Sequence, residues 1–395
     1  MPADPGYRPF APADAQALAY LVRHGFGIPA EDVEGFRDLL GDHAFRVLVR
    51  NGRPVASGAV WPMDQWFGGR PVPSLAVNQV TTDPAARGRG AATALVTSVL
   101  EEARAGGAAL CVLYSATVPL YAKLGFARAG SAFTWRAPPD ALAVGGAEAP
   151  LVRMDPLDAD LLAALRRREA PAANGMAERT EAMWTMLLRP GDEGPADVFL
   201  VPGPGGPEGY VAVLPPRGGR LAAVDLCVPG RRAARPILGF LAGYRGLVDT
   251  VTWPGGPDDP LVHLARDSGA GVAEWDEWLL RVIDVAAALE ARGYPAGLEA
   301  TLVLDVGDPV LAANHGRFRL TVAGGEGRVE RLPGDGPGEE PADLTLSVAA
   351  LAPLFSGHLA PAALRRTGGL DGGDAALATA ALVFAGPRPW MADRF

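Results

Sequence analysis

The chain has 395 residues, 49% of them hydrophobic, and a formal net charge of -9 at pH 7. A chain of this length is expected to form two or three domains. No window of about eighteen residues is uniformly apolar, and the N-terminus lacks a basic region followed by an apolar stretch, so we expect a soluble, cytoplasmic protein without a membrane partner. The acidic balance argues against a nucleic-acid partner, because binding to phosphates requires a basic surface.

The segment 80–92 is the most informative stretch of the chain, and its sequence is Val-Thr-Thr-Asp-Pro-Ala-Ala-Arg-Gly-Arg-Gly-Ala-Ala. It lies between an expected strand and an expected helix. Gly88 and Gly90 let backbone N–H groups approach an anion, and the start of the following helix adds unsatisfied donors. Arg87 and Arg89 supply charge-assisted hydrogen bonds. The segment therefore predicts a site for the diphosphate of a cofactor, with an ordinary basic turn before a helix as the alternative.

The residues after this turn predict a helix, a strand and a second, shorter helix. Apolar residues recur at three- and four-residue steps over 92–103, which is typical of an amphipathic helix, and the glycines at 106–107 end it. The apolar run 108–114 predicts a strand. The segment 118–126, Val-Pro-Leu-Tyr-Ala-Lys-Leu-Gly-Phe, predicts a short helix that carries Tyr121 and ends at its glycine.

A second α/β unit is expected after a linker at 136–146, which is rich in Pro and Gly. The patterns beyond it predict helices at 158–170, 176–188 and about 232–244, and strands at 198–201, 209–214, 220–228 and 248–253. This unit repeats the order of the first without an Arg/Gly turn. We therefore expect a degenerate copy of the first unit that binds no cofactor.

A third unit is expected to begin with residues 275–292. The alternating patterns that follow predict strands at 300–306, 316–322, 324–330 and 342–348 and a helix at 351–355.

Several other kinds of site are absent from the sequence. Cys111 and Cys227 lie in apolar, strand-like runs, so they are predicted to be core residues and not a disulfide, a metal site or a nucleophile. The histidines show no metal-ligand spacing, and no G-x-S-x-G motif is present. We therefore expect no metal and no covalent enzyme intermediate.

The order of strand, Arg/Gly turn, helix, strand and Tyr-x-x-x-Gly-Phe resembles the core of the GNAT N-acetyltransferases. The spacing Arg87-x-x-Gly90-x-Ala92 resembles the signature with which that family holds the diphosphate of acetyl-coenzyme A. With the degenerate second unit and a third unit similar to sterol carrier proteins, the whole chain resembles the Eis family (enhanced intracellular survival) of aminoglycoside N-acetyltransferases. The segments 65–74 and 278–285 look typical of that family.

The resemblance implies an α/β (α+β) fold of tandem GNAT-like domains followed by a sterol-carrier-protein-like domain. The first GNAT domain, with the acetyl-coenzyme A site, is expected at 1–137, the degenerate GNAT-like domain at 150–284, and the sterol-carrier-like domain at 285–395. Because the family forms hexamers, we expect a homo-oligomer, a hexamer by resemblance. Lipid carriage by the third domain is a weaker alternative to its closing the substrate pocket.

The resemblance also implies roles for single residues, with acetyl-coenzyme A as the cosubstrate. The residues that match its binding motif are Val80 and Thr82 for the pantetheine arm, and Arg87, Gly88, Arg89, Gly90 and Ala92 for the diphosphate. Tyr121 matches the tyrosine that protonates the leaving thiolate, since a phenol with a reference pKa near 10 stays protonated at neutral pH. The family ends in an aromatic residue whose α-carboxylate is a base, and Phe395 matches it. A core tyrosine and a merely docked terminus are the alternatives.

The expected reaction is acetyl transfer to a primary amine by direct attack in a ternary complex, as in aminoglycoside resistance. An aminoglycoside or related polyamine is the leading acceptor, and Asp64, Trp66, Phe67 and Phe26 are candidate substrate contacts. Arg394 stands where the aminoglycoside enzymes have an acidic residue. This departure favours a second hypothesis, a biosynthetic acyltransferase for a less cationic amine. A non-catalytic ligand- or lipid-binding protein on the same fold is the third.

Overall fold

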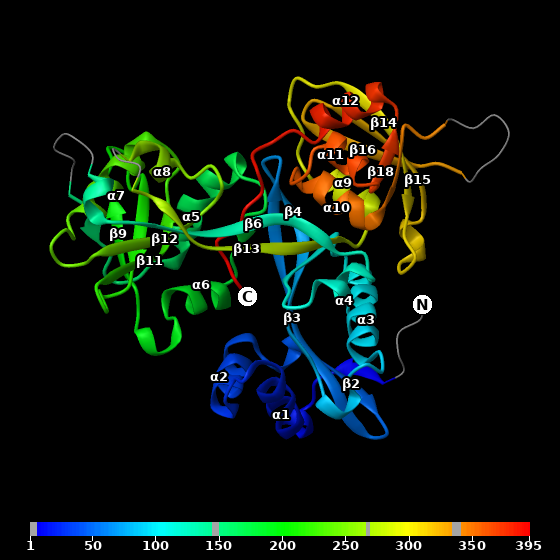
Figure 1. Cartoon of the computed structure of the whole chain (residues 1–395), viewed down its shortest axis with the longest axis horizontal. Helices are drawn as coiled ribbons and strands as arrows, with labels where there is room; N and C mark the ends of the chain where they lie inside the picture. The colour runs from blue at the N-terminus through cyan, green and yellow to red at the C-terminus, as the bar shows by residue number, and fades with distance from the viewer. Residues whose placement is uncertain (1–5, 144–149, 266–268, 334–340) are drawn as a thin grey trace.

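The computed structural model describes residues 6–143, 150–265, 269–333 and 341–395. Within these residues the strands form two sheets, one of 13 strands and one of 5, and the helices pack on both. The predicted mixed α/β class is confirmed. Figure 1 shows the first unit at the centre and bottom, the second unit on the left and the third at the upper right. No helix of the described ranges is long and apolar enough to cross a bilayer.

The first unit supplies one half of the larger sheet. Its helices are α1 (Ala15–Phe26), α2 (Ala30–Leu40), α3 (Ala91–Ala105) and α4 (Val118–Ala122), and its strands are β1 (Tyr7–Pro9), β2 (Phe45–Arg50), β3 (Arg53–Phe67), β4 (Arg70–Thr82), β5 (Leu110–Tyr114) and β6 (Ala127–Ala137). Strands β1 to β4 pair antiparallel in chain order, and β5 pairs parallel with β4.

Helix α3 forms as the sequence predicts and packs on β3 and β4. Its apolar stripe is buried, because Leu95, Val96 and Leu100 are fully covered. The helix ends at Gly106, whose N–H donates to the carbonyl of Glu102. The start of α3 therefore lies directly after the Arg/Gly turn that follows β4.

Strands β4 and β5 pair over a short length and then separate. The register joins residues 74–76 of β4 to residues 110–112 of β5, whereas β4 continues to Thr82 and β5 to Tyr114. Within the described residues, the side of β4 that faces β5 therefore has no strand partner beyond residue 76. An open strand edge of this kind can bind an extended ligand through backbone hydrogen bonds.

The second unit forms most of the other half of the larger sheet. Its helices are α5 (Ala159–Glu169), α6 (Glu181–Leu188), α7 (Arg231–Ala242) and α8 (Pro260–Leu264), and its strands are β7 (Val152–Arg153), β8 (Ala177–Glu178), β9 (Asp197–Val201), β10 (Gly209–Val213), β11 (Arg220–Cys227), β12 (Thr250–Gly255) and β13 (Gly271–Val282). The predicted strands and two of the three predicted helices are confirmed. Cys111 and Cys227 are buried in the core, as expected.

The helix predicted at 176–188 is wrong in its first turn. Residues 177–178 form β8, which pairs with β3, and the helix begins only at Glu181. The Thr180 side chain accepts a hydrogen bond from the Met183 N–H and so caps the helix there.

The predicted linker at 136–146 is also partly wrong. Its first residues complete β6, which pairs with β12, and residues 139–142 form a short turn of helix whose Leu142 is fully buried in the second unit. Residues 144–146 lie outside the described ranges. Burial of the apolar residues in this Pro-rich segment outweighs the local turn signals.

The segment 275–292 was expected to begin the third unit, but its strand belongs to the larger sheet. Strand β13 lies between β5 and β6 and pairs antiparallel with both, so the second unit contributes a strand to the first. Trp278 fixes this packing, because a Cβ at Gly130 would lie 2.1 Å from its ring. The order of strands in the larger sheet is β1-β2-β3-β4-β5-β13-β6-β12-β11-β10-β9-β7.

The third unit begins with α9 and surrounds the smaller sheet. Its helices are α9 (Val285–Ala291), α10 (Val348–Ser356), α11 (Pro361–Arg366) and α12 (Asp374–Val383), and its strands, in the order β16-β15-β14-β17-β18, are β14 (Ala300–Gly307), β15 (Gly316–Ala323), β16 (Glu326–Arg331), β17 (Leu344–Ser347) and β18 (Leu370–Gly372). The strands predicted here are confirmed, each within a few residues.

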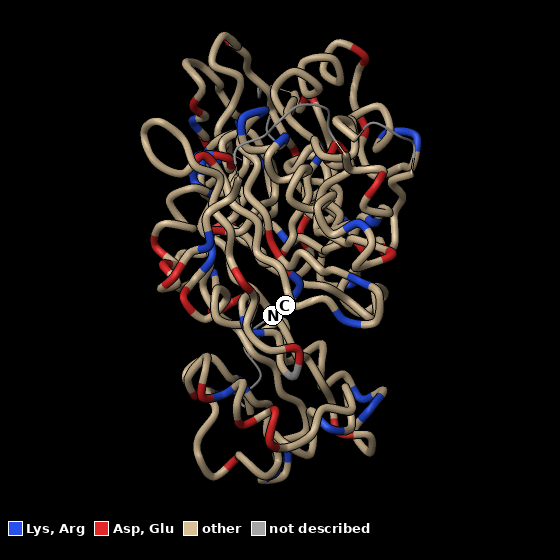
Figure 2. Tube along the Cα trace, turned by 90° about the vertical axis from the view of Figure 1, so that its left-hand side faces the viewer, with Lys and Arg blue, Asp and Glu red and all other residues tan. Residues whose placement is uncertain are grey.

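The chain ends in a tail that returns from the third unit to the centre of the molecule, as Figure 1 and, in a view turned by 90°, Figure 2 show. The backbone N–H of Trp390 donates to the carbonyl of Asn174 at 2.9 Å, and that of Met391 donates to Ser131 on β6 at 3.0 Å. The Asn174 side chain donates to the carbonyl of Pro387. These bonds place the last residue beside the open end of β5.

Candidate functional site

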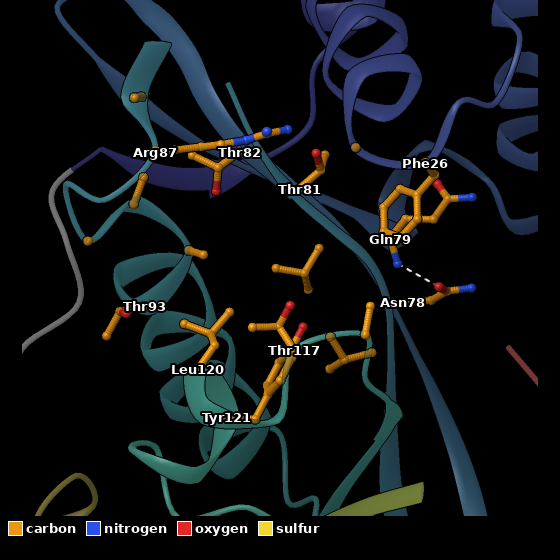
Figure 3. A pocket seen from close by; sticks show the side chains of 18 of the residues that line it. Phe26, Asn78, Gln79, Thr81, Thr82, Arg87, Thr93, Thr117, Leu120 and Tyr121 are labelled. Carbon is orange, nitrogen blue, oxygen red and sulfur yellow. Dashed lines mark hydrogen bonds between the residues drawn. The ribbon is translucent and has the colours of Figure 1, made fainter. Parts of the chain in front are cut away.

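A cavity of about 640 Å³ opens between the separated ends of β4 and β5. We call it the turn cavity. Figure 3 shows that its walls come from the end of β4, the Arg/Gly turn, the start of α3, the segment around α4 and the end of α1. Its lining contains six of the seven predicted cofactor residues, Val80, Thr82, Arg87, Gly88, Gly90 and Ala92.

The Arg/Gly turn has the backbone that its glycines predict. Gly88 and Gly90 have φ values of 73° and 74°, in the left-handed region that residues with a Cβ rarely adopt, and no atom lies within 4 Å of a Cβ built on either. Conformation, and not lack of space, therefore requires glycine here. Gly90 is the N-cap of α3, so the free N–H groups of the first helical turn border the cavity.

The two arginines of the turn differ in position. Arg87 lines the cavity, is exposed, and donates from Nη2 to the carbonyl of His24 at 3.1 Å. Arg89 is exposed beside the turn but outside the lining, and its carbonyl accepts a hydrogen bond from Arg50. Arg87 is therefore the closer of the two cations to a ligand in the cavity.

Strand β4 carries a bulge in the wall of this cavity. Ser57 pairs with Thr81 and Ala59 pairs with Asn78, so two residues of β4, Gln79 and Val80, stand opposite one residue of β3. Gln79 has a φ of 51°, and its backbone N–H donates to the Asn78 side chain (Figure 3). Bulges of this kind often lie next to active sites, where they redirect groups of the strand.

Tyr121 lies at the inner end of the turn cavity. Its side chain points into the cavity beside Thr117 in Figure 3 and is 7% exposed, and its ring packs edge-on against Phe126. Burial raises the pKa of the Tyr121 phenol above its usual value. The hydroxyl therefore stays protonated at neutral pH and can donate a proton.

A second cavity of about 360 Å³ lies at the end of the chain, and we call it the C-terminal cavity. Asp393, Arg394 and Phe395 form part of its lining, together with residues of β6, α6, β11 and β12. The Arg394 guanidinium forms an ion pair with Glu274 of β13 at 3.0 Å.

Tyr114 and Phe395 lie between the two cavities. Tyr114 ends β5 and lines the turn cavity, and its ring is edge-on to that of Phe395, with 5.9 Å between centroids. The Phe395 ring also packs on Trp61, at 5.4 Å. Burial raises the pKa of the Tyr114 phenol, so this hydroxyl is neutral too.

A buried ionic cluster holds the tail in place. The Arg179 guanidinium donates to Asp393 at 2.5 Å and to both oxygens of Asp225, at 2.6 and 3.0 Å. Arg166 and the Tyr210 hydroxyl also donate to Asp225. Burial alone would raise the pKa of Asp225, but Arg179 and Arg166 lower it below its usual value. The cluster thus fixes a carboxylate only two residues from the end of the chain.

The four predicted substrate contacts do not share one cavity. Phe26 is half-exposed and lines the turn cavity. Asp64 and Trp66 lie outside both cavities on β3, where the Trp66 indole donates to Glu178 of β8. Burial and the nearby Glu178 carboxylate raise the pKa of Asp64.

The structure is inconsistent with a substrate contact by Phe67. Its ring is fully buried and packs on Phe355 of the third unit at 5.0 Å. An aromatic residue at the end of a strand can face a solvent-lined pocket or a neighbouring domain, and the sequence does not distinguish the two. The prediction of a substrate contact at Phe67 is therefore wrong.

Three residues of the site were not singled out from the sequence: Tyr114, Arg179 and Asp393. Tyr114 could have been noticed, because it is the polar end of an apolar strand that leads to the site. Nothing local indicates that Arg179 and Asp393, which are far apart in the sequence, form a pair.

The shape and chemistry of the turn cavity fit acetyl-coenzyme A. The left-handed glycines, the helix N-terminus and Arg87 would hold its diphosphate. The open edge of β4 would bind the amide groups of the pantetheine arm, and the protonated Tyr121 lies at the inner end, toward which that arm would lead.

Comparison with known families identifies each unit. Acetyltransferase (GNAT) domain models match residues 6–129 and 175–282, and a sterol carrier protein domain model matches residues 285–392. The chain thus belongs to the GNAT family of N-acetyltransferases, in a form with two GNAT domains followed by a sterol-carrier domain, and it is an acetyltransferase.

The relatives of the chain share this architecture over its whole length. An uncharacterised N-acetyltransferase of Streptomyces avermitilis is 30% identical over 100% of this chain and 99% of its own. The crystal structure of a GCN5-related N-acetyltransferase from Anabaena variabilis, at 33% identity, covers 98% of this chain and 99% of its own with a TM-score of 0.93.

Proteins that carry the Eis name are more distant. The N-acetyltransferase Eis of Mycobacterium tuberculosis is 27% identical over 68% of each chain. The crystal structure of Eis1 from Mycobacterium abscessus, at 26% identity, covers 98% of this chain and 99% of its own with a TM-score of 0.82. The chain is therefore similar to Eis within the wider family.

Proposed function

We propose that the protein transfers the acetyl group of acetyl-coenzyme A to a primary amine by direct attack, with the two substrates bound in the two cavities. The observation that carries this proposal is the contact of Tyr114 with Phe395, because it brings the wall of the turn cavity next to the end of the chain. Acetyl-coenzyme A, when bound, supplies the thioester that the amine attacks.

The cofactor contacts in this proposal are those expected from the sequence. Arg87, Gly88, Gly90 and Ala92 hold the diphosphate, with Arg89 adding positive charge beside the turn. The backbone of Val80 and Thr82 binds the pantetheine arm.

Tyr121 acts as the general acid in this scheme. As the new C–N bond forms and the C–S bond breaks, the departing thiolate takes the proton of the Tyr121 hydroxyl. The raised pKa of this phenol supports the role, because the group is fully protonated before the reaction.

The α-carboxylate of Phe395 acts as the base. A primary amine is an ammonium ion at neutral pH and must lose a proton before it can attack. The tail places residue 395 beside Tyr114, and the Arg179–Asp393 ion pair holds the tail there. The ammonium gives one proton to the carboxylate before it attacks, and Tyr121 gives its proton to the thiolate. The nitrogen loses a second proton as the amide forms, and this proton restores the Tyr121 hydroxyl, so the step balances.

The acceptor could be an aminoglycoside or a less cationic amine, and one observation favours the second. Arg394 places a positive charge beside Phe395 and pairs with Glu274, which removes that carboxylate as a partner for a polycation. A biosynthetic acyltransferase is therefore the better hypothesis for this chain. A hexameric assembly rests on the resemblance to Eis alone and remains a proposal.

Release of coenzyme A tests this function directly. Purified protein with its native C-terminus would be incubated with acetyl-coenzyme A and a panel of aminoglycosides, polyamines, alkylamines and arylalkylamines, and the free thiol would be followed. We expect amine-dependent release with at least one class. Failure to discharge acetyl-coenzyme A with every amine would favour a non-catalytic binding protein on the same fold.

A further inference from the structure

We infer that the C-terminal cavity binds the body of an amine with a single positive charge and an apolar aryl or alkyl group, so that arylalkylamines and alkylamines are the acceptors. This inference rests on the proposed function and names its substrate class. Three features of the cavity carry it: its apolar wall, the pairing of its charges, and one buried oxygen without a partner.

The wall of the cavity is formed mainly by apolar side chains. Those from α6 and the neighbouring strands that border it are Phe133, Met183, Met186, Leu187 and Val224, with Phe395 at the end of the chain. A flexible thioether such as that of Met186 adapts to the shape of an aromatic or alkyl group. This surface would bury an apolar body and offers few hydrogen-bond partners to the hydroxyl groups of a sugar.

The charged side chains that line the cavity are paired. Arg394 binds Glu274, Asp393 binds Arg179, and Arg220 lies 3.8 Å from Glu193. Two of these lining groups are acidic and two are basic. Each additional ammonium group of a polycation would leave water without gaining a free carboxylate in this lining, which is unfavourable.

One acceptor group for a single ammonium remains. Asp393 is 7% exposed, and its Oδ1 accepts from Arg179, but its Oδ2 is buried and has no hydrogen-bond partner among the described residues. Buried polar atoms are normally hydrogen-bonded, and Asp393 belongs to the lining of the cavity, so we assign this unpaired oxygen as the acceptor for a ligand ammonium that displaces its present neighbours. An ammonium group bound there would lie two residues along the chain from the Phe395 carboxylate that we propose as its base.

The volume of the cavity agrees with a small acceptor. About 360 Å³ is near the lower end of the range for small-molecule sites. It suits one ring or a short alkyl chain better than the several rings of an aminoglycoside.

Kinetics with matched amines test this inference. 4-Phenylbutylamine carries one charge and an apolar body, whereas spermidine and kanamycin carry several charges. We expect kcat/KM for coenzyme A release to be at least about tenfold higher with 4-phenylbutylamine. Equal or higher kcat/KM with spermidine or kanamycin would overturn the inference and leave the proposed acetyl transfer intact.

Variants in the wall provide the matched comparison. Met186→Glu should raise KM for 4-phenylbutylamine about tenfold and change kcat much less, since the substitution alters the wall and not the reacting groups. Leu382→Gln is the control, because this exposed residue of α12 is not part of the cavity lining. An unchanged KM in the Met186 variant, with its melting temperature preserved, would contradict the assignment.

A binding measurement that needs no turnover distinguishes the proposed ligand of the C-terminal cavity from the proposed acetyl transfer. If no amine discharges acetyl-coenzyme A, calorimetry with 4-phenylbutylamine alone still tests the cavity. Binding that is lost in Met186→Glu and kept in Leu382→Gln would support the site although the reaction fails. No binding to the wild-type protein would overturn it.

Discussion

The ring of Phe395, the last residue, lies edge-on to the ring of Tyr114 at the end of β5, with 5.9 Å between their centroids. Tyr114 lines the turn cavity and Phe395 lines the C-terminal cavity. Strand β13 supports this contact, because its Trp278 pairs with Tyr114 and its Glu274 binds Arg394. In the proposed function, all three units therefore contribute to one site: the first forms the turn cavity, the second provides α6 and β13, and the third provides the C-terminal tail.

The acid role of Tyr121 predicts a loss of kcat in Tyr121→Phe. Steady-state coenzyme A release should fall by about 10²-fold, while KM for acetyl-coenzyme A stays nearly constant. Because burial raises the pKa of the Tyr121 phenol above 10, activity should not fall between pH 7 and 10 through its ionisation. Tyr244→Phe in the second unit is the control. A Tyr121 variant with wild-type kcat would remove this assignment.

The left-handed backbone of the turn predicts a cofactor-binding defect in Gly90→Ala. A Cβ at a φ of 74° destabilises that conformation by roughly 1–2 kcal/mol, so the N–H groups at the start of α3 should move away from the diphosphate. KM for acetyl-coenzyme A should rise about tenfold. Gly52 has the same φ and equally open surroundings in another turn, so Gly52→Ala should show the strain without the change in KM.

The buried ionic cluster predicts that Arg179→Met lowers both the free energy of unfolding and kcat. It leaves Asp393 and part of Asp225 without a partner, which should lower the free energy of unfolding by about 3–5 kcal/mol. It should also lower kcat, since the tail is no longer held, and Arg179→Lys should restore part of both.

Chemical denaturation and coenzyme A release would measure these effects. Arg153→Met, which breaks the exposed pair with Asp197, should change stability by at most about 1 kcal/mol. If Arg179→Met loses stability but keeps full kcat at a temperature where it is folded, Arg179 has no positioning role.

The buried carboxyl group of Asp259 should make the free energy of unfolding depend on pH. Burial raises the pKa of this carboxyl group from 3.8 to about 6, against the hydrogen bonds it accepts as N-cap of α8. Because the folded-state pKa is the higher one, the protein binds this proton more tightly when folded, and the resulting stability is lost as pH rises from about 4 to about 6.

Asp259→Asn keeps a capping oxygen and removes the charge. Its free energy of unfolding should exceed that of wild type by an amount that grows over the same pH interval, to on the order of 3 kcal/mol. Asp158→Asn, at the exposed N-cap of α5, is the control. A difference between wild type and Asp259→Asn that does not change with pH would contradict this prediction.

Most of the lining of the turn cavity could be predicted from the sequence, because its signals are local. The left-handed glycines, the helix that follows them and Tyr121 lie within about forty residues, and each leaves its own pattern. The C-terminal cavity could not, because it depends on pairings between distant segments. The insertion of β13 beside β5, the burial of Phe67 on the third unit and the Arg179–Asp393 pair follow from tertiary packing alone. Apolar periodicity shows that a residue faces a hydrophobic core, but it does not show which of the cores in the molecule the residue faces.

The most direct test of the account is to add one glycine after Phe395 and measure kcat for coenzyme A release with the best amine. The addition moves the α-carboxylate by one residue and leaves the turn cavity unchanged. We expect kcat to fall by about 10²-fold, while acetyl-coenzyme A binding and the melting temperature stay at their wild-type values. An extended protein with unchanged kcat would show that the terminal carboxylate is not the base, and the proposed catalytic role of Phe395 would be wrong.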